Sequence, residues 1–210
     1  MKIGIIGSGN MGSSLARLWA AGGHEILLTS TSPEQTKEVA DSIGRNVITG
    51  TTSDAVNYGD VVVFAFPYSS LDDVISKGGS FDNKIIIDLI NPLTDDAQDL
   101  LMGHTTSAAE EISKRLPKAK VIKAFNTVAS PVIQSEQGIN FKGIAPDVYY
   151  CGGDEESKKV VKQLIEDIGF ESIDAGPLTN ARFLEPMAEF VIQLAMLGMG
   201  ADIAIKILRR

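Results

Sequence analysis

Three glycines near the start of the chain have the spacing of a dinucleotide-binding loop. Residues 2–12 read KIGIIGSGNMG, so an apolar run leads directly into Gly7, Gly9 and Gly12, and an amphipathic segment follows. In such a loop the first glycine permits a tight turn, the second lets a pyrophosphate approach the backbone, and the third lets the helix pack closely on the strand. The free N–H groups at the start of that helix attract phosphate. Against the alternative of a glycine turn in a nucleotide-free α/β domain, we predict that the pyrophosphate contacts Gly7, Ser8, Gly9, Asn10, Met11 and Gly12.

Hydroxyl side chains stand where NAD-binding proteins carry an acid. The second predicted strand is followed by Ser30, Thr31 and Ser32, with no carboxylate at this position. An acid there binds the ribose 2′-OH of NAD, whereas hydroxyls donate to a 2′-phosphate without repelling it. Lys37 adds a positive charge one helical turn further on. These four residues favour NADP over NAD; the alternative is that the hydroxyls serve only as turn and helix-cap residues.

Three later predicted strands end in residues that we expect to line the rest of a cofactor groove. Ligands of open α/β sheets bind at the carboxyl ends of the strands. The predicted strands at 60–66, 84–90 and 120–125 all end close to prolines or asparagines. The further cofactor-binding residues predicted in this way are Phe66, Pro67, Tyr68, Asn91, Pro92 and Asn126.

No side chain in the sequence stands out as a catalytic acid, base or metal ligand. The two histidines are His24, in a turn before the second strand, and His104, in a loop before a helix cap. Metal-ligand spacing and a Gly-x-Ser-x-Gly elbow are both absent from the sequence. Reduction of a ketone or imine requires a proton donor, whereas passing a hydride between two redox cofactors does not. We therefore predict no catalytic side chain and no metal.

Composition and charge restrict the partners and the compartment. The chain has 210 residues and a net charge of −8, which argues against binding to nucleic acid or an anionic membrane. Cys151 is the single cysteine, and the first strand leaves no room for a signal peptide, so we expect a cytoplasmic protein.

The apolar stretch 183–208 contains charged residues and is expected to be a core or interface helix. We predict a homodimer through Met187, Val191, Leu194 and Leu197; the alternative is that this helix folds back on its own sheet.

Apolar runs alternate with amphipathic segments along the chain and predict an α/β fold. Several runs are apolar on both faces, which is typical of parallel strands covered on both sides. We expect a doubly wound, mostly parallel Rossmann sheet with extra C-terminal strands and a terminal helical segment. Residues 1–176 would form the dinucleotide-binding domain and 177–210 the helical segment. Ser32, Ser107 and Asp154 are expected helix caps, and the glycines at 198 and 200 are expected to break the last helix. The predicted strands are 2–6, 25–30, 46–50, 60–66, 84–90, 120–125, 147–151 and 171–174.

Several longer motifs resemble one known family, the coenzyme F420-dependent NADP oxidoreductases. The resemblance extends nearly from end to end and is most specific in the last third. It implies hydride transfer between NADP(H) and the deazaflavin F420, with Asn126, Thr127 and Val128 near the nicotinamide and the acceptor ring. Ser30 matches a serine that the family uses for the 2′-phosphate, but Thr31 stands where an arginine is usual. The motifs include the glycine loop 7–12, 23–25, Pro67 with its aromatic neighbour, 107–110, 151–161, 174–178, Asn180, Arg182, Glu185 and 198–200.

Other functions fit part of the same pattern. Residues 123–128, KAFNTV, also resemble the cytosolic domain of six-transmembrane metalloreductases, which use NADPH and a flavin. The alternatives are therefore an NADPH-dependent flavin or ferric reductase with FMN or FAD, and a reductase of a small carbonyl or imine. A third alternative is an NADP-binding sensor without turnover.

Overall fold

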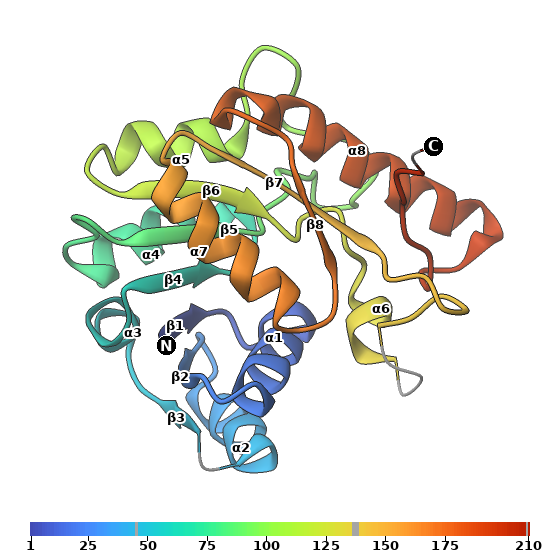
Figure 1. Cartoon of the computed structure of the whole chain (residues 1–210). Helices are drawn as coiled ribbons and strands as arrows, with labels where there is room; N and C mark the ends of the chain where they lie inside the picture. The colour runs from blue at the N-terminus through green and yellow to red at the C-terminus, as the bar shows by residue number, and fades with distance from the viewer. Residues whose placement is uncertain (45, 136–138, 209) are drawn as a thin grey trace.

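One mixed sheet organises the molecule. The computed structural model describes residues 1–44, 46–135, 139–208 and 210, and these form an eight-stranded sheet in the order β3-β2-β1-β4-β5-β6-β7-β8 (Figure 1). The first six strands in this order are parallel, β7 runs antiparallel to β6, and β8 is parallel to β7. The strands are β1 (Lys2–Ile6), β2 (Glu25–Thr29), β3 (Val47–Thr49), β4 (Val61–Phe64), β5 (Ile85–Asp88), β6 (Lys120–Ala124), β7 (Asp147–Gly152) and β8 (Glu171–Asp174).

This arrangement confirms the predicted α/β class and all eight predicted strands. The chain passes from β1 to β2 and β3 on one side, then returns to β4 on the other, so the strand order reverses between β1 and β4. In open α/β sheets, ligands bind at the carboxyl ends of the strands beside such a switch point. The topology therefore predicts a ligand site at the turns that follow β1, β2 and β4.

Helices cover both faces of the sheet (Figure 1). Alternate residues of each strand point to opposite faces, so Val61 and Val63 pack in one buried cluster while Val62 and Phe64 pack in the other. The first cluster is covered by α1 (Asn10–Ala21), α2 (Pro33–Ile43), α6 (Ser130–Gln134) and α7 (Glu155–Glu166). The second is covered by α3 (Thr52–Tyr58), α4 (Leu71–Gly78), α5 (Ala108–Arg115) and α8 (Ala181–Leu194). Shorter helical turns are η1 (Tyr68–Ser70), η2 (Leu178–Asn180) and the π-helical turn η3 (Ala195–Met199).

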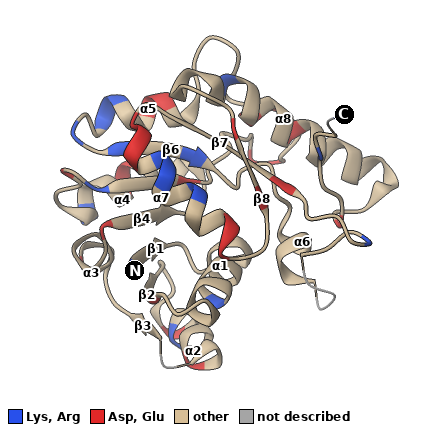
Figure 2. Cartoon of the chain, viewed as in Figure 1, with Lys and Arg blue, Asp and Glu red and all other residues tan. Residues whose placement is uncertain are grey.

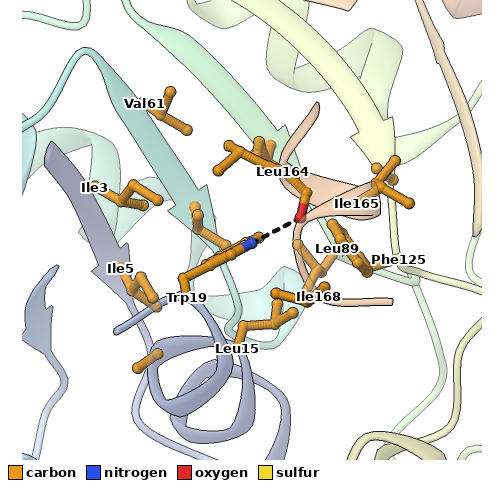
Figure 3. Packing of buried hydrophobic residues seen from close by; sticks show 14 of the residues in the cluster. Ile3, Ile5, Leu15, Trp19, Val61, Leu89, Phe125, Leu164, Ile165 and Ile168 are labelled. Carbon is orange, nitrogen blue, oxygen red and sulfur yellow. Dashed lines mark hydrogen bonds between the residues drawn. The ribbon is translucent and has the colours of Figure 1, made fainter. Parts of the chain in front are cut away.

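Trp19 connects α1, the helix that follows the glycine loop, to α7, the helix between β7 and β8. Its side chain is fully buried among β1, α1 and α7, and its indole N–H donates to the Leu164 carbonyl at 2.9 Å (Figure 3). Its ring also meets that of Phe125 edge-on, with centroids 5.8 Å apart. A buried indole requires such a partner for its N–H, so Trp19 fixes α1 against α7 as well as filling the core.

The predicted helix ends are mostly confirmed. Ser107 accepts from the Glu110 N–H at 3.2 Å, and Asp154 accepts from the Ser157 N–H at 2.8 Å. Ser32 differs: it occupies the N-cap position of α2, but its side chain makes no cap hydrogen bond. Thr36, within α2, donates to the Ser32 carbonyl instead. The last helix ends as predicted, because Gly198 in η3 has a φ of 104°.

The C-terminal residues fold back on the sheet. The Lys206 ammonium lies 2.7 Å from Asp147 in β7 and 2.6 Å from Glu171 in β8, and the Ile207 N–H donates to Asp147. Within the described ranges, none of the helices combines the length and the apolar content needed to span a bilayer. The division into domains 1–176 and 177–210 stays a prediction.

Candidate functional site

The turn between β1 and α1 has the geometry that its glycines predict. Gly7 has a φ of 113°, and a Cβ placed there would lie 2.1 Å from the Ala65 carbonyl oxygen. A Cβ on Gly12 would lie 1.9 Å from the Gly7 carbonyl oxygen. A Cβ on Gly9 would have no neighbour within 4 Å. Gly7 and Gly12 are therefore required by the fold itself, whereas Gly9 is required only if something else approaches the loop.

The N-terminus of α1 is open at this loop. Gly9 is the N-cap residue of α1, and no side chain caps the first turn. The unpaired N–H groups and the positive end of the helix dipole together attract an anion. A phosphate group fits the loop chemically, because backbone donors surround a position that no side chain of the loop fills.

A cleft of about 900 Å³ opens beside the glycine loop, at the carboxyl ends of β1, β2, β3 and β4. Eight of the predicted cofactor-binding residues line it: Gly7, Ser8, Gly9, Ser30, Thr31, Ser32, Phe66 and Pro67. The cleft's lining does not include the other eight: Asn10, Met11, Gly12, Lys37, Tyr68, Asn91, Pro92 and Asn126. Further lining residues, not predicted from the sequence, include Gln35, Thr36, the segment 49–54, Ser70, Asp73, Val74 and Lys77.

Thr36 connects the hydroxyl groups of the cleft. Its Oγ1 lies 2.7 Å from Ser30 Oγ and 2.9 Å from Ser8 Oγ, and it donates to the Ser32 carbonyl. The network joins the glycine loop to the turn after β2. This role could not be predicted from the sequence, because Thr36 lies inside a helix; its burial, with 1 % of it exposed, is seen only in the structure.

The two lysines near this cleft are placed differently. Lys37 does not line the cleft, and its ammonium forms an ion pair with Asp41 one helical turn further on, at 2.7 Å. Lys77 of α4 lines the cleft and is paired with Asp73 at 2.8 Å. Ligands of open α/β sheets bind at the carboxyl ends of the strands, and the helix that follows β4 also borders this crevice. Applied to that helix as well as to the strand ends, this rule would have suggested Lys77 as a cleft residue.

The turns after β5 and β6 are joined by a pair of asparagines. Asn91 Nδ2 donates to the Asn126 carbonyl at 2.9 Å, and Asn126 Nδ2 donates to Asn91 Oδ1 at 3.0 Å. Asn126 Nδ2 also donates to the Leu184 carbonyl at 2.9 Å. Both contacts of Nδ2 are to acceptors, so the orientation of the Asn126 amide is fixed. Phe125, just before this turn, has a φ of 62°, an unusual conformation for a bulky residue.

Two polar atoms in this second turn are buried without a partner. Asn126 and Thr127 are each 6 % exposed, and neither Asn126 Oδ1 nor Thr127 Oγ1 has a hydrogen-bond partner in the described structure. An unsatisfied buried acceptor costs about 1–3 kcal/mol. Such a cost is acceptable where a ligand supplies the missing hydrogen bond.

Three charged side chains lie buried directly beneath these asparagines. Lys123 Nζ is 2.8 Å from Glu185 and 3.0 Å from Asp88, and all three side chains are fully buried. Lys123 also donates to the Ile90 carbonyl. Burial raises the pKa of Glu185, and the neighbouring ammonium of Lys123 opposes that shift. The sequence did not reveal this cluster, because Lys123 and Asp88 lie within apolar strands and Glu185 within a helix.

The cluster explains several of the family-like motifs. Glu185 accepts from the N–H groups of Ala108 and Ala109 at 2.9 and 3.2 Å, at the N-terminus of α5. One turn earlier, Arg182 donates to both carboxylate oxygens of Glu110 at 2.7 and 2.8 Å, and this contact lowers the pKa of Glu110. The motif at 107–110 and the residues Arg182 and Glu185 therefore form one contact between α5 and α8.

A smaller apolar cavity of about 350 Å³ lies beside α8. It begins at Ala129, next to the half-buried Val128 of the predicted acceptor site. Three of its lining residues are alanines, whose short side chains leave the space unfilled, and the π-helical turn η3 forms one wall. Such turns are frequent at functional sites. The cavity is lined by Ala129, Val191, Ile192, Ala195, Met196 and Ala201.

The remaining titratable candidates lie outside these two cavities. His24 bridges the N-terminal ammonium and Asp167, at 3.2 and 3.1 Å, beside the amino end of β2. His104 is exposed in the loop before α5. Cys151 is buried, and burial raises its pKa to about 12, so its thiol is protonated at neutral pH as expected for a core residue. The described residues contain no group of histidine, cysteine and acidic side chains arranged to hold a metal.

Comparison with known proteins identifies the family. Residues 2–92 match the family model described as NADP oxidoreductase, coenzyme F420-dependent. An F420-dependent NADP reductase of Methanocaldococcus jannaschii is 31 % identical over 210 aligned positions, which cover 92 % of each chain. The chain belongs to the F420-dependent NADP oxidoreductase family. Membership of this family confirms the resemblance inferred from the motifs.

Three further proteins resemble the chain to different degrees. A solved structure described as a putative F420-dependent NADP reductase from Arthrobacter sp. FB24 superposes with a TM-score of 0.89 over the whole of both chains, at 26 % identity. The metalloreductase STEAP3 of Rattus norvegicus is 29 % identical over 88 % of this chain, but that match covers only 36 % of the rat protein. An imine reductase of Streptomyces aurantiacus, at 16 % identity and a TM-score of 0.66, shares the fold.

Proposed function

We propose that this protein transfers a hydride between NADP(H) and coenzyme F420. The observation that carries the proposal is the open space at Gly9, next to glycines that the fold itself requires. It occurs in a chain that aligns with 92 % of an F420-dependent NADP reductase. When bound, NADPH supplies the hydride and the deazaflavin accepts it.

The two cavities suggest a division of roles. The larger cleft would hold NADP(H), with Gly7–Gly12 at the pyrophosphate and the hydroxyls of Ser30, Thr31 and Ser32 at the 2′-phosphate. The buried Thr36, which donates to the Ser32 carbonyl, would hold Ser30 in place rather than contact the phosphate. Phe66 and Pro67 extend its lining from the glycine loop towards β5. We keep Lys37, Tyr68, Asn91 and Pro92 as proposed contacts at the margins of this site.

The turn after β6 would lie where the two cofactors meet. Asn126 Oδ1 and Thr127 Oγ1 are buried and lack a partner among the described residues, and neither residue lines the two cavities. We propose that ligand binding opens this turn, so that Oδ1 accepts from an N–H group of a ring and Oγ1 donates or accepts. The acceptor ring would lie beside Val128, and the apolar side chains that line the neighbouring cavity would cover it and exclude water. The protein would then work mainly by holding the two reacting carbons about 3–3.5 Å apart.

Replacing Thr31 with arginine should strengthen NADPH binding. The guanidinium would supply the charge-assisted hydrogen bond to the 2′-phosphate that the present hydroxyls supply only in neutral form, worth about 1–2 kcal/mol. Isothermal titration calorimetry with NADPH and NADH measures the effect. NADH, which lacks the phosphate, is the internal control; an equal gain for both cofactors would show that Thr31 does not face the phosphate.

Replacing His104 with alanine should lower the hydride-transfer rate by less than about tenfold, because direct hydride transfer needs no side-chain acid at this position. Stopped-flow measurement of NADPH oxidation gives the rate, and thermal unfolding checks that stability is unchanged. A loss of about 10²-fold or more is typical of a proton-transfer group and would favour a carbonyl or imine reductase.

We further propose a homodimer formed through α8. Its inner face, which includes Leu184 and Val191, is buried against the sheet, so Val191 does not belong to the outer stripe predicted from the sequence. Phe183, Phe190 and Leu197 are 65, 57 and 81 % exposed, and most of α8 carries no charge (Figure 2). The exposed residues at 183, 190 and 197 form an outer stripe that recurs every seven residues, a spacing that suits packing against an identical helix. Met187, also predicted for the dimer contact, packs partly against the buried cluster beneath α8.

Replacing Phe190 with glutamate should dissociate this dimer, because a charge in an apolar contact remains unpaired. Light scattering at micromolar concentration measures the mass. Leu101→Glu is the matched control, since Leu101 is 58 % exposed but lies outside the stripe. A wild-type protein that is already monomeric at this concentration removes the proposed dimer.

A flavin or ferric reductase is the second candidate, because the chain aligns over 88 % of its length with a metalloreductase. Anaerobic oxidation of NADPH, measured separately with F420, FMN, FAD and a ferric chelate, distinguishes the candidates. We expect F420 to be reduced with the highest kcat/KM.

We also propose a cytoplasmic location, which the single, buried Cys151 supports.

A further inference from the structure

The buried cluster of Asp88, Lys123 and Glu185 has no assigned role in the proposed reaction. Asp88 ends β5 and is paired in register with Lys123 in β6. Three residues after each of them come Asn91 and Asn126, which hydrogen-bond to one another. An ion pair and an amide pair therefore join the same two strand ends, one layer above the other.

Helix α8 is attached to both layers. Glu185 contacts Lys123 at 2.8 Å, and the adjacent Leu184 carbonyl accepts from Asn126 at 2.9 Å. Glu185 also accepts from the N–H groups of Ala108 and Ala109, which connects α5 to the same point. The orientation of Asn126 thus depends on where α8 lies. Glu185 is one of the contacts that hold α8 there, together with the Arg182–Glu110 pair and the buried apolar residues of the helix.

Stability alone is a poor reason for such a cluster. A buried ion pair generally contributes no more than apolar side chains of the same size, because both charges lose their hydration. Here two carboxylates share one ammonium, so the excess charge depends on backbone N–H groups, those of Ala108 and Ala109 for Glu185 and that of Ile90 for Asp88. A fully satisfied network of this kind holds its members in one arrangement.

We infer that Lys123 and Glu185 are positioning residues that hold the Asn126 amide, and with it the turn 126–128, in the geometry that hydride transfer requires. This inference rests on the proposed function for its kinetic consequence. Its structural consequence, a rigid Asn126 side chain, can be measured without any acceptor.

Glu185→Gln is the decisive variant. The groups that face the Glu185 carboxylate are all donors: Lys123 Nζ and the two N–H groups of α5. A glutamine has nearly the same shape but turns an NH2 group towards at least one of these donors, so α8 must shift. The Lys123–Asp88 pair remains intact, and we therefore expect this variant to fold. Lys123→Met is the stronger change, because it leaves two buried carboxylates without their cation.

Lys206→Met is the matched control. Lys206 also bridges two carboxylates, Asp147 and Glu171, and Asp147 is fully buried. Its loss should lower stability through a similar defect, but in β7 and β8 rather than beneath the turn 126–128. A general effect of lost stability on the rate would therefore appear in this control as well.

Two measurements test the inference. In the wild-type protein without ligands, the Asn126 side-chain NH2 signals in NMR should exchange slowly with solvent, because both protons are hydrogen-bonded; in Glu185→Gln they should exchange rapidly. In single turnovers with deuterated NADPH, Glu185→Gln should slow hydride transfer by about 10- to 100-fold, with NADPH affinity nearly unchanged and a full isotope effect. Lys206→Met should leave both readouts as in the wild type.

Slow exchange at Asn126 in folded Glu185→Gln would overturn the inference, as would a rate loss no greater than that of Lys206→Met. A wild-type protein that does not reduce F420 would contradict the proposed function only. The exchange measurement would then still decide whether Lys123 and Glu185 hold Asn126.

Discussion

Replacing Gly9 with valine should abolish NADPH binding while leaving the protein folded. A side chain at this position meets no protein atom within 4 Å, and the Gly9 φ of −69° suits any residue, so the fold tolerates the change. A branched side chain would occupy the space through which the pyrophosphate must approach the N–H groups of α1. We expect the affinity for NADPH to fall by at least about 10²-fold, equivalent to about 2.7 kcal/mol.

Calorimetry of NADPH binding and thermal unfolding measure these two effects separately. Gly153→Val is the matched control, because a Cβ at Gly153 also meets no atom within 4 Å but the residue lies in the turn before α7. It should bind NADPH normally. Near-normal affinity in folded Gly9→Val would mean that this loop is not the phosphate site.

Replacing Val128 with tryptophan should block the acceptor and spare the donor. Val128 is half-buried beside the apolar cavity that begins at Ala129, and an indole would fill the space proposed for the deazaflavin ring. Since displacing a reacting group by about 1 Å can cost 10²-fold in rate, we expect at least that loss in kcat/KM for F420. NADPH affinity should remain nearly unchanged.

Val160→Trp is the control for this prediction. Val160 is also half-buried and packs against the same apolar cluster, but it lies on α7. Steady-state kinetics with F420 and binding of NADPH should both stay close to the wild-type values. Equal turnover by Val128→Trp and the wild type would remove Val128 from the acceptor site.

The sequence was most informative where one physical requirement determines the residue type. Gly7 and Gly12 are predictable because a Cβ at either position would overlap a backbone oxygen. The strands are predictable because both faces of the sheet are covered. The same feature hides the direction of β7: all six of its residues are buried, so its pattern is identical for a parallel and an antiparallel neighbour.

Side-chain networks were much harder to predict. Thr36 connects the hydroxyls of the cleft, yet nothing in its neighbours in sequence separates it from an ordinary helical threonine. Lys123 and Glu185 are brought together from positions 62 residues apart, and only the docking of α8 makes them a pair. Helix α8 is apolar on two faces, so periodicity alone could not tell that Val191 lies inside and Phe190 outside.

Direct hydride transfer from NADPH to F420 is tested most directly by following a label. The purified protein is mixed anaerobically, in ordinary water, with F420 and with NADPH deuterated on either face of C4. Absorbance reports reduction of the deazaflavin, and mass spectrometry reports where the deuterium lies. We predict rapid reduction with deuterium from one face of NADPH retained in reduced F420. No reduction of F420, or reduction without the label from either face, would contradict direct hydride transfer.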